Sequence, residues 1–125
     1  MDYLEEPESL YNLKDRTKKF ALDYIALTEK LPNTYLGNHI RGQLIRCSTS
    51  VASNYRAAKR AQTKKVFISK ISIVLEEADE SDFWLEVIEE KTMIDDTEEV
   101  SRLKKEAGEL TAIFVQTRRT AQKRR

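Results

Sequence analysis

Apolar side chains recur at alternating intervals of three and four residues, without a slip, in four segments of this 125-residue chain. This spacing places them on one stripe of an α-helix, and the two-residue period of a β-strand fits none of the segments. The first stripe is Leu10, Leu13, Thr17, Phe20, Tyr24, Leu27 and Leu31, and the second is Ile40, Leu44, Cys47, Val51, Asn54 and Ala58. The third is Phe67, Ile71, Val74, Ala78, Ser81, Leu85 and Ile88, and the fourth is Val100, Leu103, Ala107, Leu110, Phe114, Thr117 and Ala121.

The residues between the stripes carry signals that end and begin helices. Pro32 lacks the amide that a helix interior needs, so Pro32 and Asn33 are predicted to end the first helix. Thr63 can cap the third helix, and the acids of residues 95–99 suit the positive end of the fourth. The pattern predicts helices over about residues 9–31, 38–60, 64–91 and 96–122.

Short connections make consecutive helices antiparallel neighbours. We therefore expect an all-α, antiparallel up-and-down four-helix bundle over residues 9–122, with an N-terminal tail of residues 1–8 and a basic C-terminal tail of residues 123–125. The single cysteine and single histidine argue against a disulfide and against a Cys-rich or His-rich metal site. No apolar run approaches the ~20 residues of a membrane span, and the acidic N-terminus does not resemble a signal peptide. We expect a cytoplasmic protein with no cofactor, no metal, no small-molecule substrate and no membrane contact.

Charge is distributed in blocks, although the formal net charge is only +1. Residues 1–29 carry a net charge of −3 and residues 76–99 a net charge of −11. Residues 30–75 carry +9 with no acid at all, and residues 100–125 carry +6. Blocks of this kind create strong local fields even when the total is near zero.

The up-and-down order brings the end of the second helix, the start of the third and the end of the fourth to one end of the bundle. The cations predicted to bind nucleic acid are Arg46, Arg56, Lys59, Arg60, Lys64, Lys65, Arg118, Arg119, Lys123, Arg124 and Arg125. Arg46 belongs to this set as part of a basic outer stripe on the second helix, and the acids of the N-terminal tail are expected near the same end. None of these residues is suited to reading base edges, so we expect binding to phosphates with weak sequence preference. Pairing of basic and acidic ends between subunits, or simple solvation, are the alternatives.

The third helix has bases at its start and acids at its end, which is the unfavourable order for the helix dipole. It also carries a second apolar stripe, Ile68, Ile73, Trp84 and Val87, which we interpret as a contact between subunits of an oligomer, with a wider core face as the alternative.

Four single residues allow both a structural and a functional interpretation. Tyr55 lies beside the basic stripe, where it can stack on a base or pack against a helix flank. Asn54 falls on the apolar seam and can fix its register. Cys47 is interpreted as a buried small side chain rather than a reactive thiol, and His39 as a residue of the helix start.

No catalytic residue is predicted. The acidic stretch of residues 76–82 suggests a magnesium-dependent nucleotide pyrophosphohydrolase, but the heptad directs Glu76, Asp79 and Glu80 outward and leaves Glu77 and Asp82 only beside the seam. A di-iron site needs paired Glu-x-x-His motifs, which are absent from the sequence. We therefore predict a non-enzymatic protein. A protein–protein adaptor is the main alternative, and a carboxylate–magnesium hydrolase is the weaker one.

The middle of the chain resembles a bacterial family, the four-helix-bundle proteins encoded in intervening sequences of 23S ribosomal RNA genes. Their relatives include the accessory variability determinant of diversity-generating retroelements. The resemblance rests on residues 31–32, 40–58 and 65–70, and chiefly on Gln43, Arg46, Ser48, Val51, Asn54 and Phe67. Many members read Asn-Ile-Ala-Glu-Gly where residues 54–58 of this chain read Asn-Tyr-Arg-Ala-Ala. The resemblance implies a homopentameric barrel and, for the retroelement relatives, binding to nucleic acid and to a reverse transcriptase.

Overall fold

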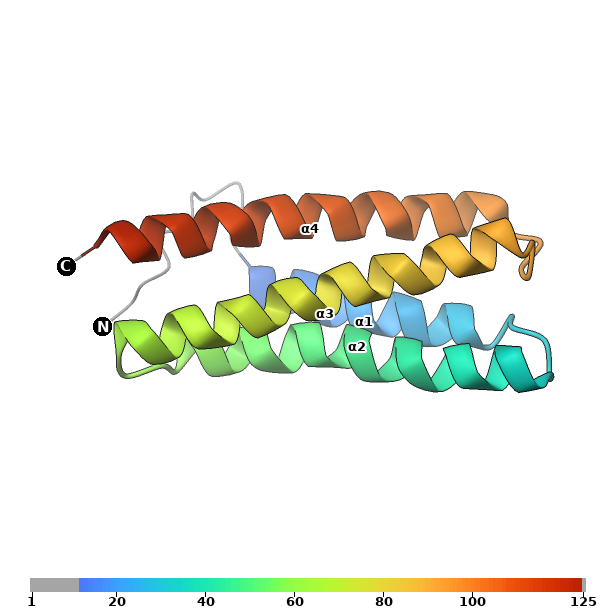
Figure 1. Ribbon diagram of the computed structural model, residues 1–125, viewed down its shortest axis with the longest axis horizontal. Coiled ribbons are helices and arrows are strands. Elements are labelled where there is room, and N and C mark those ends of the chain that lie inside the picture. Colours follow the sequence, from blue (N-terminus) through green and yellow to red (C-terminus); the bar gives the residue numbers. More distant parts are fainter. Residues whose placement is uncertain (1–11, 125) are drawn as a thin grey trace.

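Four antiparallel helices make up the fold in the computed structural model, which describes residues 12–124. The helices are α1 (Leu13–Thr28), α2 (Tyr35–Lys59), α3 (Lys64–Glu90) and α4 (Thr97–Lys123), and each runs back along its predecessor (Figure 1). The described part of the chain contains no strand. The predicted all-α class and four-helix architecture are thus confirmed.

Side-chain caps begin the last three helices. Thr63 accepts a hydrogen bond from the amide of Val66 at 3.1 Å, and Asp96 accepts one from the amide of Glu99 at 3.1 Å, so both predicted starts are confirmed. Thr34 caps α2 by accepting from the amide of Gly37 at 3.0 Å, which places the start of α2 three residues before the expected residue 38.

Hydrogen bonds from Arg41 stabilise the turn between α1 and α2. α1 ends at Thr28, before Pro32 is reached. The Arg41 guanidinium then donates to the carbonyls of Thr28, at 3.2 Å, and Leu31, at 3.0 Å. Arg41 thereby satisfies carbonyls that the end of α1 leaves without helical partners.

The predicted apolar stripes form the core of the bundle. All the predicted positions of α3 are buried, as are those of the first stripe from Leu13 to Leu31, whereas Leu10 lies outside the described residues. On α4 only Thr117 departs from the prediction, since it is half-buried.

The second stripe contains one error of prediction. Tyr55 is fully buried, with its ring centroid 5.6 Å from that of Phe114, whereas Asn54 is half-buried and donates to the Ser50 carbonyl at 3.0 Å. Neither a register-fixing Asn54 nor a base-stacking Tyr55 is therefore present. A straight helix drifts about 20° per heptad from a strict seven-residue repeat, so two heptads after Ile40 the stripe passes to the next residue.

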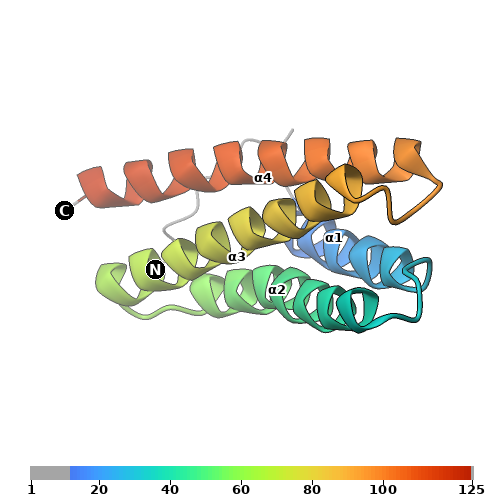
Figure 2. The same ribbon diagram turned by 45° about the vertical axis from the view of Figure 1, so that its right-hand side comes forward.

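The bundle is more open between α1 and α4 than between its other neighbouring helices. These two helices share few contacts, whereas the α1–α2, α2–α3 and α3–α4 pairs are closely packed. Figure 2 shows α4 lying against α3 and away from α1. The first helix is also the shortest, with 16 residues against 25 to 27 in the others, and it stops short of one end of the bundle (Figure 1).

Candidate nucleic-acid interface

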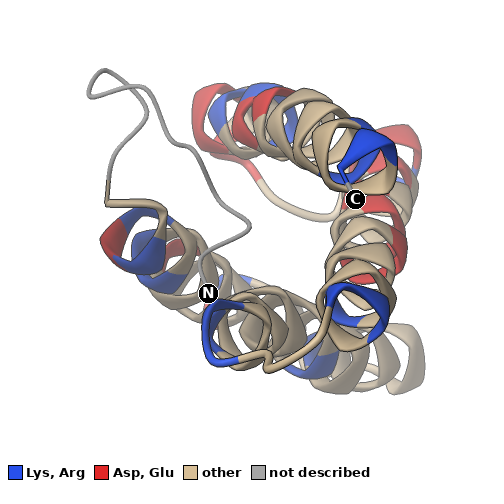
Figure 3. Ribbon diagram, turned by 90° about the vertical axis from the view of Figure 1, so that its left-hand side faces the viewer, with Lys and Arg blue, Asp and Glu red and all other residues tan. Residues whose placement is uncertain are grey.

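One end of the bundle collects cations from three helices. The end of α2, the start of α3 and the end of α4 meet there, and Figure 3 shows Lys and Arg at the near end of each. We call this surface the basic end, and it consists of Arg56, Lys59, Arg60, Lys64, Lys65, Arg118, Arg119, Lys123 and Arg124. Arg125, which was predicted to join it, lies outside the described residues.

A direct contact holds two parts of the basic end together. The Lys64 ammonium, in the first turn of α3, donates to the backbone carbonyls of Gln122, at 3.1 Å, and of Arg124. Arg118 on α4 also donates to the hydroxyl of Ser72 on α3 at 3.3 Å. Residues 46 to 60 positions apart along the chain are thereby fixed beside one another.

Positive charge at the basic end is largely uncompensated. Within residues 12–124, the cations that pair with carboxylates are Arg16, Lys19, Lys30, Arg46, Arg102 and Lys104. None of these six belongs to the basic end, where Arg56, Lys59, Arg60, Lys64, Lys65, Arg118, Arg119 and Lys123 have no carboxylate partner among the described residues. Cations grouped without acids create a field that attracts polyanions.

Arg46 does not belong to this group. It lies in the middle of α2, where it pairs with Glu77 at 2.9 Å and with Glu80 on α3. Its hydrogen bond lowers the pKa of Glu80 below the ordinary value, so Glu80 stays ionised at neutral pH. The two carboxylates compensate the Arg46 charge, and Arg46 is better described as a link between α2 and α3. The pattern of the single helix could not reveal these partners on another helix.

Two further cations escaped the sequence analysis. Lys14 and Lys18 are exposed in the first turns of α1, and neither has a carboxylate partner in the described part of the chain. The sequence analysis did not select these two lysines, because residues 1–29 carry a net negative charge. They extend positive charge from the basic end along the side of α1.

The opposite end of the bundle is acidic but partly neutralised. Lys30 pairs with Asp96 at 2.9 Å, Lys104 pairs with Glu89 at 3.1 Å, and Arg102 pairs with Glu99 at 2.6 Å. The two ends therefore differ in sign and also in how far their charges are compensated within the chain.

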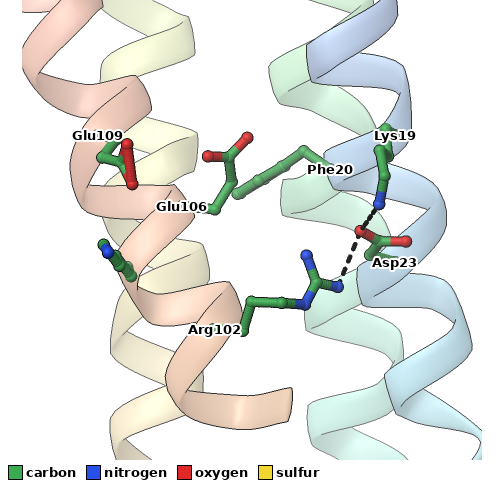
Figure 4. A pocket seen from close by; sticks show the side chains of 7 residues that line it. Lys19, Phe20, Asp23, Arg102, Glu106 and Glu109 are labelled. Atoms are coloured by element: carbon green, nitrogen blue, oxygen red, sulfur yellow. Dashed lines mark hydrogen bonds and ion pairs between the residues drawn. The ribbon is translucent and has the colours of Figure 1, made fainter. Parts of the chain in front are cut away.

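A pocket lies between α1 and α4, where the bundle is open. It has a volume of about 220 Å³ and is lined by Lys19, Phe20, Asp23, Arg102, Lys105, Glu106 and Glu109 (Figure 4). Asp23 accepts hydrogen bonds from Lys19, at 2.7 Å, and Arg102, at 3.0 Å. Burial opposes the ionisation of Asp23, but these two bonds outweigh it and lower the pKa. Lys19, Asp23 and Arg102 pair with one another, and Glu106 and Glu109 pair with Arg16 outside the lining, so the lining charges do not form a set of groups directed at a ligand.

The remaining candidate group, the thiol of Cys47, lies in the core. Cys47 is fully buried beside the Ser81 hydroxyl, which donates to its sulfur at 3.1 Å, and burial raises the pKa of the thiol to about 11. Cys47 is therefore a protonated core residue at neutral pH. Within residues 12–124, no three His, Cys, Asp or Glu side chains are grouped as metal ligands.

The comparison with known families identifies the chain. The family model described as 23S rRNA-intervening sequence protein matches residues 11–116. The chain belongs to this family. A solved structure with 29% sequence identity supports the assignment: a protein of unknown function from the S23 ribosomal protein family of Bacteroides thetaiotaomicron VPI-5482. The similarity covers 83% of this chain and 95% of that one, with a TM-score of 0.76. Among curated proteins, none matches the chain.

The residues that we assigned to a subunit contact of this 23S rRNA-intervening sequence protein lie partly against its own core. Ile68, Trp84 and Val87 are partly buried, and Ile73 is half-buried. The more exposed apolar side chains of α3 are Val66, at 43%, and Phe83, at 51%. The Phe83 ring centroid lies 5.0 Å from that of Trp84, whose ring centroid lies 5.5 Å from that of His39.

Among residues 12–124, none of the helices has both the length and the apolar composition of a membrane-spanning segment.

Proposed function

We propose that this 23S rRNA-intervening sequence protein binds nucleic acid without catalysing a reaction, by contacts from its basic end to backbone phosphates. The observation that carries the proposal is the meeting of three helix ends whose cations have almost no carboxylate partners within the described chain. Charge that is not neutralised internally remains available for an external polyanion.

We propose that the lysines and arginines of this surface contact phosphates, and we therefore expect little sequence preference. Contacts to phosphates fix the position of a protein on nucleic acid without reading the bases. The order of charges on α3 also supports the proposal. Lys64 is explained by its bonds to the end of α4. Lys65 is exposed at the unfavourable end of the α3 dipole and has no such partner among the described residues.

Binding of labelled RNA and DNA oligonucleotides, followed by fluorescence anisotropy at increasing salt, tests the proposal. If about five phosphates of a duplex are contacted, the slope of ~0.9 per phosphate predicts an affinity loss of a few hundredfold between 50 and 200 mM salt. Binding that salt does not weaken, or no binding at low salt, contradicts the proposal.

A matched pair of variants locates the surface. Arg60→Gln with Lys65→Gln removes two exposed cations from the basic end. Lys91→Gln with Lys105→Gln removes two exposed cations elsewhere that have no carboxylate partner in the described part of the chain. The net charge changes equally in both. We expect at least a tenfold loss of affinity for the first pair and less than a threefold loss for the second. Equal losses would show that only the total charge matters.

We also propose, from the family resemblance, that the chain assembles as a homopentamer. The outward-facing Phe83 and Val66 on α3 are consistent with a contact between copies. In a cyclic assembly every basic end points the same way, so the positive field is concentrated at one rim.

A protein partner is the second candidate, because Phe83 is half-exposed beside Trp84 and His39. The resemblance to retroelement accessory proteins suggests a reverse transcriptase as this partner. A co-purification of the tagged chain with a reverse transcriptase encoded nearby tests it. A complex that survives nuclease treatment supports an adaptor, and a complex that nuclease dissolves supports bridging by nucleic acid.

A further inference from the structure

The last turns of α4 have little apolar packing to hold them in place. Among residues 115–124, Ala121 alone is fully buried, and its side chain is a single methyl group. Arg119 and Lys123 are exposed four residues apart, where like charges on one face destabilise a helix. Helix ends with few buried apolar contacts open readily. The cations that α4 brings to the basic end therefore need a further contact to stay in place.

Lys64, in the first turn of α3, supplies such a contact. Its half-buried side chain donates to the backbone carbonyls of Gln122, at 3.1 Å, and of Arg124. The last carbonyls of a helix have no helical partner and form the negative end of its dipole, so an ammonium group is well suited to cap them. Figure 1 shows the start of α3 and the end of α4 on the same side of the bundle. Lys64 thus caps α4 from a neighbouring helix.

The adjacent Lys65 differs from Lys64 in its surroundings. It is exposed, and no hydrogen bond or ion pair joins it to another residue of the described chain. Both lysines lie at the positive end of the α3 dipole, where a cation is unfavourable. For Lys64 the carbonyls of α4 offset this cost, and they occupy donors of an ammonium group that Lys65 can direct at an external phosphate.

We infer that Lys64 is a positioning residue of the nucleic-acid interface, which caps α4 and thereby holds Arg119 and Lys123 at the basic end without contacting phosphate itself. The sequence analysis predicted that Lys64 binds nucleic acid directly, and this inference gives it a different role. The effect on binding rests on the proposed function, whereas the capping of α4 does not.

The first test measures the capping without nucleic acid. Lys64→Met keeps a long side chain but removes its donors, and Lys65→Met makes the same change of charge at the exposed neighbour. We expect amide hydrogen exchange in the last turns of α4 to become about fivefold faster in Lys64→Met and to stay unchanged in Lys65→Met. Lys64→Arg restores donors and is expected to restore slow exchange. Equal exchange in Lys64→Met and the wild-type protein overturns the inference.

The second test is a double-mutant cycle on the binding of a labelled DNA duplex at low salt. Lys64→Met and Lys65→Met are each made in the wild-type chain and in a chain that carries Arg119→Gln and Lys123→Gln. In the wild-type chain we expect each to weaken binding about fivefold. In the other chain, where α4 no longer presents these two cations, we expect Lys64→Met to weaken binding less than about twofold and Lys65→Met to keep its full effect.

The two tests separate failure of this inference from failure of the proposed function. An equal effect of Lys64→Met in both chains would show that Lys64 contacts phosphate directly, which overturns the inference and leaves the proposed function standing. If the wild-type protein binds no DNA at low salt, the proposed function fails, and the exchange experiment still decides whether Lys64 caps α4.

Discussion

Gly37, in the first turn of α2, lies directly against the backbone of the preceding turn. A Cβ atom at this position would lie 2.0 Å from the Pro32 carbonyl oxygen, a distance that cannot occur without movement of the backbone. Gly42 lies further along the same helix, and a Cβ atom there would meet nothing within 4 Å. The two glycines of α2 thus differ in the space available for a side chain: Gly37 has none, whereas Gly42 has room for one.

The substitution Gly37→Ala is expected to lower the free energy of unfolding by about 1–3 kcal/mol, because the methyl group collides with backbone that cannot move aside easily. Gly42→Ala is the control and is expected to raise it by up to about 1 kcal/mol, because alanine is the better helix former. Urea unfolding followed by circular dichroism measures both. Two variants of equal stability would mean that the α1–α2 turn relaxes freely.

At the scale of the elements, polar contacts do much to attach α1 to α4. The Arg16 guanidinium donates to both oxygens of Glu106, at 2.7 and 2.8 Å, and Arg102 reaches Asp23 at 3.0 Å. Both pairs are only partly buried, so each contributes modestly. α1 is therefore held chiefly by its packing against α2, and these links add modestly to its attachment to α4.

Arg16→Gln is expected to accelerate amide hydrogen exchange in α1 about fivefold while leaving α3 unchanged, because loss of about 1 kcal/mol favours local opening of the helix. Lys18→Gln removes an exposed cation of the same helix that has no ion pair within residues 12–124, and we expect no change from it. Exchange measured by mass spectrometry on peptides of α1 and α3 distinguishes the two. Unchanged exchange in Arg16→Gln would show that apolar packing alone holds α1.

The whole molecule combines separated charge with an outward apolar surface on α3. Charge separation along the axis comes from the order of the helices. This order brings the bases at the end of α2, the start of α3 and the end of α4 to one end, and the acids at the end of α3 and the start of α4 to the other. The apolar residues Val66 and Phe83 point away from the core of the single chain, and we expect them to be covered in an assembly.

Multi-angle light scattering is expected to give the wild-type protein a mass about five times the chain mass of 14.5 kDa. Phe83→Asp is expected to reduce this mass by placing a charge in the contact between copies. Leu22→Asp, at a 54% exposed position on α1, serves as the control and is expected to leave the mass unchanged. A monomeric wild-type protein would contradict the assembly, and a Phe83→Asp pentamer would place the contact elsewhere.

The heptad pattern sufficed to predict four helices, their antiparallel order and nearly all of the core. Burial of one apolar stripe dominates the folding of such a chain, and the stripe is written in the local spacing of residues. The sequence also predicted that Lys64 and Arg124 lie at the same end of the bundle, because short turns make consecutive helices antiparallel. The family resemblance was likewise visible in residues 40–58.

Only the tertiary structure decided which charges are neutralised and which side chains are covered. Arg46 had the same local pattern as Arg60, yet carboxylates on α3 compensate Arg46, whereas no carboxylate among residues 12–124 pairs with Arg60. Tyr55 lies in the core where the pattern predicted Asn54, because a straight helix drifts from a strict seven-residue repeat and the drift accumulates over two heptads. Ion pairing and burial depend on neighbours from other helices. The sequence pattern gives the period of each helix, but it does not give the rotation of each helix about its own axis, which decides which side chains of neighbouring helices face each other.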